Sequence, residues 1–289
     1  MVKVVTDSTG YLEKQAVKEL DIQVLSLNVE FEGDTYREVD LNNEDFYSMM
    51  EERGVPKSSQ PPVGDFIQAF EAILEEGQEV LGVFLSGSMS GTLTTAMMAR
   101  DMVLKKYPEG KIELLDSQSN CMQLGFAVEA AAKAAKEGKS LEAVKSAAER
   151  MKERSRFLFV PKNLKYLQKG GRIGKANALI GNLLSIIPIL TVEQGETAIF
   201  KKVRRKKKAV EEMVNKLLSD HGEYQVKEVV IHHIAALEEG KDLARRIEET
   251  LDVPVRVLDI GPVIGLHVGP GAIGIAYHTK EAEKTTKDS

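Results

Sequence analysis

The sequence is poor in cysteine, in aromatic residues and in long apolar runs. Cys121 is the only cysteine among 289 residues, so the chain can form no internal disulfide or cysteine-based metal cluster. This cysteine content fits a protein of the reducing cytoplasm. No apolar run approaches the ~20 residues that a membrane-spanning helix needs. The opening residues become polar too soon for the apolar stretch of a signal peptide. We therefore expect a soluble, cytoplasmic protein.

Neither sign of charge dominates the sequence. The 44 acidic and 39 basic side chains leave a net charge of −5, which argues against broad nucleic-acid binding, and we expect no nucleic-acid partner. The exception is residues 201–208, where all but one of the side chains are Lys or Arg. A solvated charged face explains such a run. The functional alternative is a docking patch for an acidic partner or an anionic membrane surface.

The first half of the chain alternates β-rich runs with helical patterns, and 43% hydrophobic residues provide ample material for a core. We predict strands at residues 3–6, 22–31, 80–85 and 111–115, and helices at residues 11–20 and 66–74. This alternation indicates parallel βαβ units around a central sheet. Small polar residues follow three of these strands, at the edge where such sheets bind ligands.

The pattern changes near residue 155. We predict strands at residues 156–160, 228–232, 253–258 and 272–277, a β-hairpin at 189–203, and helices at 163–187, 209–218 and 237–251. Gly170-Gly171 would break the first of these helices. The prediction is an α/β fold of two domains. Residues 1–155 would form a domain on a parallel sheet, and residues 156–289 an α+β domain on a mixed sheet.

Residues 86–92 form a loop of small residues between a predicted strand and a helix. Open backbone N–H groups at a helix N-terminus attract anions. The loop lacks the Gly-Lys-Ser/Thr ending of a nucleotide-binding loop, which argues against a triphosphate ligand. The Gly-x-Ser-x-Gly motif of hydrolases does not occur around Ser90. Plain capping of the helix by Ser88 or Ser90 is the alternative explanation.

A second small-residue cluster, residues 267–274, matches Gly-x-Gly-x-x-Gly only formally. A strand pattern follows it and too little chain is left for a βαβ unit, so we reject a dinucleotide site. The glycines instead predict a tight loop that presents His267. Its imidazole could donate a hydrogen bond to an anion. A purely structural histidine is the alternative.

Taken together, these clusters resemble the DegV family, whose characterised members bind fatty acids. The resemblance covers nearly the whole chain and rests on the shared order and spacing of several short motifs. They are Val5-Thr6-Asp7-Ser8-Thr9, Ser58-Ser59-Gln60-Pro61, Ser90-Gly91-Thr92, Asp116-Ser117-Gln118-Ser119, Lys169-Gly170-Gly171-Arg172 and His267-Val268-Gly269-Pro270-Gly271.

The resemblance implies a fatty acid bound between two α/β domains, with no metal and no cofactor. Its carboxylate would be held by Ser58, Ser90 and His267. The supporting loop residues would be Ser59, Gly91, Thr92, Gly269 and Gly271. Position 58 is serine where threonine is common, which keeps the hydroxyl. The second loop begins Ser86-Gly87 where two serines are frequent, which puts secondary contacts in doubt.

Similar proteins serve as the lipid-carrying subunit of a bacterial fatty-acid kinase. A separate ATP-binding subunit phosphorylates the carboxylate, and the acyl phosphate passes to membrane phospholipid synthesis. By the same resemblance, Arg172 and Arg204 are candidates for the surface that meets the kinase or the membrane.

The unusually apolar residues 178–190 could line a lipid tunnel or simply pack in the core. Burying about fifteen methylenes at ~0.8 kcal/mol each gains on the order of 12 kcal/mol before losses, and association takes back several kcal/mol or more. The carboxylate must not be buried unpaired. Two hydroxyls, an imidazole and backbone N–H groups can satisfy it, so we expect no Lys or Arg among its direct contacts.

Two other functions remain open. One is a hydrolase with Ser90 as nucleophile, His267 as base and Asp7 or Asp116 orienting the imidazole. The other is a binding module for an anionic ligand that is not a lipid. A long apolar tunnel would exclude the second. For the first, Ser90→Ala should cost an enzyme its turnover, whereas in a carrier it should weaken lipid retention.

Overall fold

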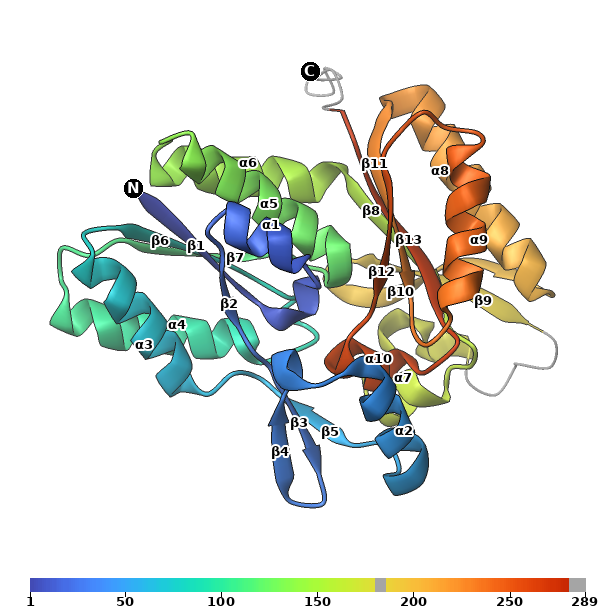
Figure 1. Cartoon of the computed structure of the whole chain (residues 1–289), viewed down its shortest axis with the longest axis horizontal. Helices are drawn as coiled ribbons and strands as arrows, with labels where there is room; N and C mark the ends of the chain where they lie inside the picture. The colour runs from blue at the N-terminus through green and yellow to red at the C-terminus, as the bar shows by residue number, and fades with distance from the viewer. Residues whose placement is uncertain (180–185, 281–289) are drawn as a thin grey trace.

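The computed structural model describes residues 1–179 and 186–280 of the chain (Figure 1). The strands are β1 Val2–Asp7, β2 Gln23–Leu25, β3 Asn28–Phe31, β4 Asp34–Arg37, β5 Lys57–Ser59, β6 Glu79–Phe84, β7 Ile112–Asp116, β8 Ser155–Val160, β9 Ile187–Glu193, β10 Glu196–Val203, β11 Val226–His233, β12 Val255–Asp259 and β13 Ile273–Thr279. The α-helices are α1 Lys14–Glu19, α2 Asn43–Arg53, α3 Val63–Glu75, α4 Thr92–Lys106, α5 Cys121–Lys136, α6 Leu141–Arg154, α7 Lys165–Lys169, α8 Lys206–Tyr224, α9 Leu237–Glu248 and α10 Pro262–Val268. Short 3-10 helices are η1 Ser8–Gly10, η2 Glu38–Asp40 and η3 Gly174–Leu179.

The first sheet is parallel, as the alternation of strands and helices predicts. Its strand order is β2-β1-β6-β7. Successive residues of each strand face opposite sides of the sheet. In β1, for example, Val5 packs into the core beneath α3 and α4, whereas Val4 belongs to the core that contains α5. Both faces are covered by helices (Figure 1), which explains the nearly continuous apolar character of these strands.

The second sheet is mixed, also as predicted, with the strand order β10-β9-β8-β13-β11-β12. Only β11 and β12 pair in parallel; the other neighbours are antiparallel. Helices α8 and α9 cover its outer face (Figure 1). All strands of the first sheet precede residue 155 and all strands of this one follow residue 154. The division into two domains at residue 155 stays a prediction.

Helix α5 joins the two sheets. It contacts β1 and β6 of the first sheet and β8 and β13 of the second. Being covered on both sides, it is apolar around most of its circumference. The His232 ring on β11 accepts a hydrogen bond from the backbone N–H of Met122 at Nε2, 3.1 Å away. One continuous core therefore runs from the first sheet through α5 to the inner face of the second.

A third, small sheet of order β4-β3-β5 lies with α2 beside α10 (Figure 1). It corrects the prediction of one strand over residues 22–31. The chain leaves the first sheet after Leu25, and β3 begins at Asn28 in the small sheet. An alternating pattern cannot reveal such a change of sheet, because both strands have the same period.

The predicted helix over residues 163–187 is also wrong over most of its described residues. Helix α7 ends at Lys169, the 3-10 helix η3 follows, and residue 187 already belongs to β9. Gly171 adopts a φ of 69°, which ends α7 as its sequence suggested. Residues 180–185, within the apolar stretch 178–190, lie outside the described residues. Among the helices that are described, none is both long and apolar enough to cross a membrane.

Candidate functional site

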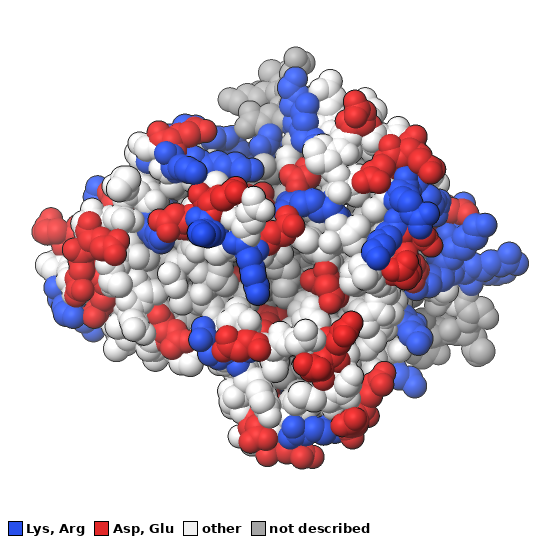
Figure 2. All heavy atoms as spheres, viewed as in Figure 1, with Lys and Arg blue, Asp and Glu red and all other residues white. Residues whose placement is uncertain are grey.

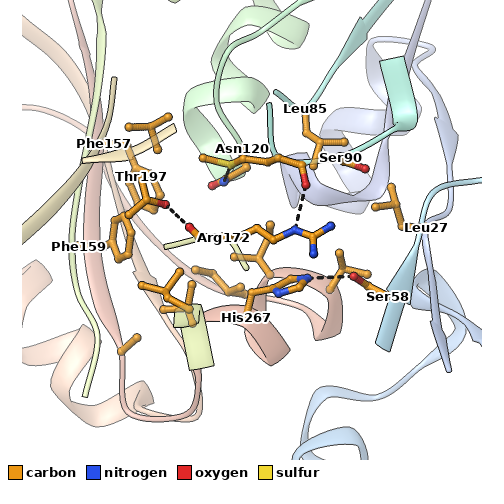
Figure 3. Close-up of a pocket in the computed structure, with 18 of the residues that line it drawn as sticks. Leu27, Ser58, Leu85, Ser90, Asn120, Phe157, Phe159, Arg172, Thr197 and His267 are labelled. Atoms are coloured by element: carbon orange, nitrogen blue, oxygen red, sulfur yellow. Dashed lines mark hydrogen bonds between the residues drawn. The ribbon is translucent and has the colours of Figure 1, made fainter. Parts of the chain in front are cut away.

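A pocket lies between the two sheets and the small third sheet. The empty space between its atoms amounts to about 860 Å³, a volume that includes open solvent. Its wall is mainly apolar, formed by Leu27, Leu85, Phe157, Phe159, Leu167, Val192, Ile260, Val263, Ile264, Val268, Ala272 and Ile273. In Figure 3 Ser58, Ser90 and His267 lie on one side of the pocket, and Phe157 and Phe159 on the opposite side.

The pocket brings together two motifs that are far apart in the sequence. Ser58 lies on β5, which pairs with β3 so that Ser58 is opposite Val29. His267 lies in the last turn of α10. The Oγ of Ser58 and the Nε2 of His267 are 2.9 Å apart, within hydrogen-bond distance. His267 therefore projects from a helix; the expectation that a glycine loop presents it is wrong.

The imidazole of His267 is neutral at physiological pH. Burial, followed by the positive charge of Arg172, lowers its pKa from 6.5 to about 4. Its Nδ1 is buried and has no hydrogen-bond partner among the described residues. A Cβ atom at position 170 would lie 2.2 Å from that nitrogen. Gly170 is thus the residue that makes room for the ring, a role that we did not predict from the sequence.

Ser90 lies in the loop that precedes α4. Its Oγ is 2.9 Å from the Oγ1 of Thr92 and accepts a hydrogen bond from the Thr92 N–H at 3.3 Å. The N-cap residue of α4 is Gly91, and no side chain caps the helix in the usual way. Neither Ser88 nor Ser90 occupies the N-cap position, but the Ser90 hydroxyl does accept an N–H of the first turn, so the capping alternative is correct in part for Ser90. Ser90, Gly91 and Ser59 all line the pocket.

The acidic motifs after the first and fourth parallel strands support this loop. The Asp7 carboxylate accepts hydrogen bonds from the Leu85 N–H (2.7 Å) and from the Thr9 N–H and hydroxyl. Asp116 accepts from the Gly87 and Gln118 N–H groups. Within the part of the chain that the structure describes, no carboxylate is hydrogen-bonded to His267. The arrangement of a hydrolase triad through Asp7 or Asp116 is therefore not formed.

Arg172 lines the same pocket, although we predicted it for a partner surface. Its Nε donates to the Met89 carbonyl (3.1 Å) and its Nη1 to the Gly170 carbonyl (2.7 Å). In Figure 3 the guanidinium is drawn between Ser90 and His267. Arg204 is exposed on the connection between β10 and α8 and does not line the pocket.

Of the three glycines predicted to support the site, Gly269 and Gly271 lie outside the pocket lining. Gly269 has a φ of 87°, and a Cβ atom there would lie 2.3 Å from the Tyr166 ring. Gly271 has a φ of 83° and donates its N–H to the Ile234 carbonyl at 2.7 Å. The positive φ favours glycine at both positions, and at position 269 the Tyr166 ring also leaves no room for a side chain. Thr92 is buried and contacts Ser90 rather than the pocket.

The chain is thus an α/β protein with a mostly apolar pocket that has hydroxyls and a neutral imidazole at one end. The chain belongs to the DegV family, whose model matches residues 1–280. A DegV domain-containing protein of Clostridium acetobutylicum is 54% identical over 280 residues, which cover 97% of this chain and 98% of that protein. One of Halalkalibacterium halodurans is 35% identical, covering 97% and 99%.

Solved structures of the family show the same fold. A DegV family protein from Thermus thermophilus, described by its fatty-acid binding, superposes with a TM-score of 0.88 at 29% identity, covering 96% of this chain and 99% of that one. DegV of Bacillus subtilis, a fatty acid binding protein, gives 0.87 at 32% identity with the same coverage. A stearic acid-binding protein from Eubacterium ventriosum gives 0.87 at 27% identity, covering 97% and 99%.

Proposed function

We propose that the chain binds one long-chain fatty acid in this pocket and performs no chemistry on it. The acyl chain lies along the apolar wall that includes Phe157 and Phe159, and Ser58, Ser90 and His267 hold the carboxylate. The observation that carries the proposal is the contact between Ser58 and His267 at one end of an apolar pocket. The fatty-acid binding of the Thermus thermophilus and Bacillus subtilis relatives supports it.

The chemistry of the polar end suits a carboxylate. A neutral imidazole with its proton on Nε2 donates one hydrogen bond, and the two serine hydroxyls can donate two more. Arg172 adds positive charge nearby while its Nε and Nη1 donate to carbonyls. We therefore keep the hypothesis that no arginine contacts the carboxylate directly. An Arg172 guanidinium bonded to the carboxylate in a crystal structure with lipid would contradict it.

We further infer that the bound lipid is presented to an ATP-dependent kinase subunit, with transient contact to an anionic membrane. Figure 2 shows Lys and Arg side chains gathered over the end of the molecule where α8, α9 and β9 lie. In the run 201–208, Lys201 and Lys208 pair with Glu212 and Lys206 with Glu239, whereas Arg204 and Lys207 have no such partner among the described residues. Positively charged side chains at the N-terminus of α8 lie beside the positive end of its helix dipole, which is unfavourable. This favours a functional reason for the basic run.

The basic run is tested with vesicles. The double variant Arg204→Glu and Lys207→Glu should bind vesicles of phosphatidylglycerol several-fold more weakly than the wild type, because charge near an anionic surface attracts cations. Lys105→Glu, an exposed change on α4, serves as the control. Equal binding by all three proteins would contradict a membrane contact through this surface. We also propose a cytoplasmic location, consistent with the free, buried thiol of Cys121.

The first test of lipid binding is mass spectrometry of an organic extract of the purified protein. We expect one fatty acid per chain, retained more weakly by Ser90→Ala and by His267→Gln. Ser88→Ala, an exposed serine of the same loop, is the matched control and should retain the lipid like the wild type. A protein that yields no lipid and also refuses added palmitic acid would contradict the proposal.

The close approach of Ser58 and His267 favours one alternative, a serine hydrolase. A serine paired with a histidine can act as a nucleophile. The hydrolase we considered from the sequence used Ser90, but His267 lies against Ser58. Labelling of Ser58 by a fluorophosphonate, together with turnover of a fatty-acyl ester, would establish the enzyme; we expect neither.

A further inference from the structure

Helix α10, which carries His267, cannot cap its own N-terminus. The helix runs over only seven residues and its N-cap residue, Gly261, has no side chain. Pro262 occupies the first position and lacks an N–H, so the open donors are those of Val263 and Ile264. Buried donors of this kind need a partner from elsewhere in the structure.

Two side chains from the first forty residues supply that partner. The Oε1 of Glu38 accepts a hydrogen bond from the Val263 N–H at 2.8 Å, and the Tyr11 hydroxyl accepts one from the Ile264 N–H at 3.1 Å. The hydroxyl of Tyr11 donates in turn to Glu38 Oε1, 2.9 Å away. Ser8 donates to the other carboxylate oxygen. The cap is therefore a connected network, and Glu38 is only 4% exposed within it.

The backbone of α10 is shaped to receive these side chains. A Cβ atom at Gly261 would lie 2.6 Å from the Tyr11 ring and 3.0 Å from a Glu38 oxygen. One turn later, a Cβ atom at Gly265 would lie 2.0 Å from the Tyr47 hydroxyl, which donates to the Ile260 carbonyl at 3.0 Å. Glycine at both positions lets residues of the N-terminal part hold α10 in one place.

We propose that Tyr11 and Glu38 are positioning residues of the carboxylate site, because their cap fixes the helix turn from which His267 projects its Nε2 into the pocket. The inference rests on the proposed function. His267 is four residues after Val263, so the two lie on one face of the helix, one turn apart. In a helix of only seven residues, the turn after the capped one is already the turn that carries His267, so fraying after loss of the cap reaches His267 directly.

The experiment separates binding of the carboxylate from binding of the acyl chain. Tyr11→Phe keeps the ring but removes the hydroxyl that accepts from Ile264, and Glu38→Gln keeps an acceptor for Val263. We expect Tyr11→Phe to raise the Kd for palmitic acid by about three- to tenfold, the scale of a lost helix cap, and Glu38→Gln to have a smaller effect. Hexadecanol, which has the same chain length without the carboxylate, should keep its Kd within about twofold.

A double-mutant cycle decides whether the effect passes through His267. In a His267→Gln background, Tyr11→Phe should have no further effect on palmitic acid binding, since the imidazole it positions is gone. An undiminished effect in that background, an equal loss for palmitic acid and hexadecanol, or no loss for either ligand would each overturn the positioning role. Circular dichroism and thermal unfolding confirm that each variant is folded.

A failure of the positioning role can be distinguished from a failure of the proposed function. In that case the folded wild-type protein would bind no palmitic acid. If the wild type binds palmitic acid and the variants bind it equally well, only the positioning role is wrong.

Discussion

The Nε2 atom of His267 lies 2.9 Å from the Oγ of Ser58, although the two residues are 209 positions apart. The contact joins the small third sheet, through β5, to helix α10. It places a hydroxyl and a neutral ring nitrogen at the same end of an apolar pocket. Any ligand whose polar group enters this end must replace or share that hydrogen bond.

Ser58 is tested by a matched pair of substitutions. Ser58→Ala removes the hydroxyl and should weaken palmitic acid binding about tenfold, because a hydrogen bond to a charged group is worth ~1.5–3 kcal/mol. Ser58→Thr retains the hydroxyl and should stay within about threefold of the wild type. Isothermal titration calorimetry measures both. Equal losses in the two variants would show that the hydroxyl is not what matters at this position.

Gly170 is predicted to be intolerant of any side chain. In Gly170→Ala the new methyl group would meet His267 Nδ1, which the present geometry places 2.2 Å from it, so the ring must move away from Ser58. We expect at least a tenfold rise in the Kd for palmitic acid, of the order of one lost charge-assisted hydrogen bond.

The control for Gly170 is Gly222→Ala in α8. Nothing lies within 4 Å of a Cβ atom at position 222, so this change should leave binding unaltered. It should raise the free energy of unfolding by about 0.5–1 kcal/mol, through helix propensity. Urea unfolding and lipid titration distinguish the two variants. Unchanged lipid binding by Gly170→Ala would refute the steric argument.

The protonation of His267 gives a prediction about pH. Burial, and then Arg172, lower its pKa from 6.5 to about 4, so the free protein holds the neutral ring while the unfolded chain takes up a proton below about pH 6.5. The resulting contribution to stability is present above about pH 6.5 and is lost as the pH falls to about 4. Titration of the ring carbons by NMR should yield the low pKa, and Arg172→Gln should raise it. A ring that titrates near pH 6.5 in the folded protein would contradict the assignment.

The raised pKa of Glu38 predicts the opposite dependence of stability on pH. Burial raises the pKa of its carboxyl from 4.5 to about 7, against the hydrogen bonds that it accepts. Its contribution to the free energy of unfolding is full below about pH 4.5 and is lost as the pH rises through 7. Glu38→Gln cannot ionise, so relative to the wild type it should be more stable at pH 8 than at pH 5. Urea unfolding at the two pH values measures this difference, and its absence would mean that Glu38 does not titrate near neutrality.

Much of the fold follows from local sequence patterns. The parallel strands β1, β6 and β7, the hairpin of β9 and β10, and the mixed second sheet all agree with the predictions. Their residues are apolar at the right period and end in turn-forming residues, and these signals need no knowledge of distant partners. The predictions that fail are those for residues 22–31 and for the described part of 163–187, where the chain changes sheet or breaks into short turns.

The candidate site, like the fold, could be predicted only in part. The sequence supplied the motifs, and their resemblance to the DegV family implied the candidates Ser58, Ser90 and His267. The structure places all three on one pocket, and their role in holding a carboxylate stays a prediction. The sequence could not show that Arg172 lines that pocket or that Gly170 makes room for the imidazole of His267. Those facts depend on which side chains meet after folding.

By itself, then, the sequence determined the order and type of most elements and the short polar motifs that mark the ligand edge. Only the tertiary structure decided which motifs touch. It joined His267 to Ser58 rather than Ser90, and it capped α10 with Tyr11 and Glu38 from more than 220 residues away. The physical reason is that periodicity and turn chemistry act between near neighbours in the chain. Partners across the fold are chosen by the packing of all the elements at once.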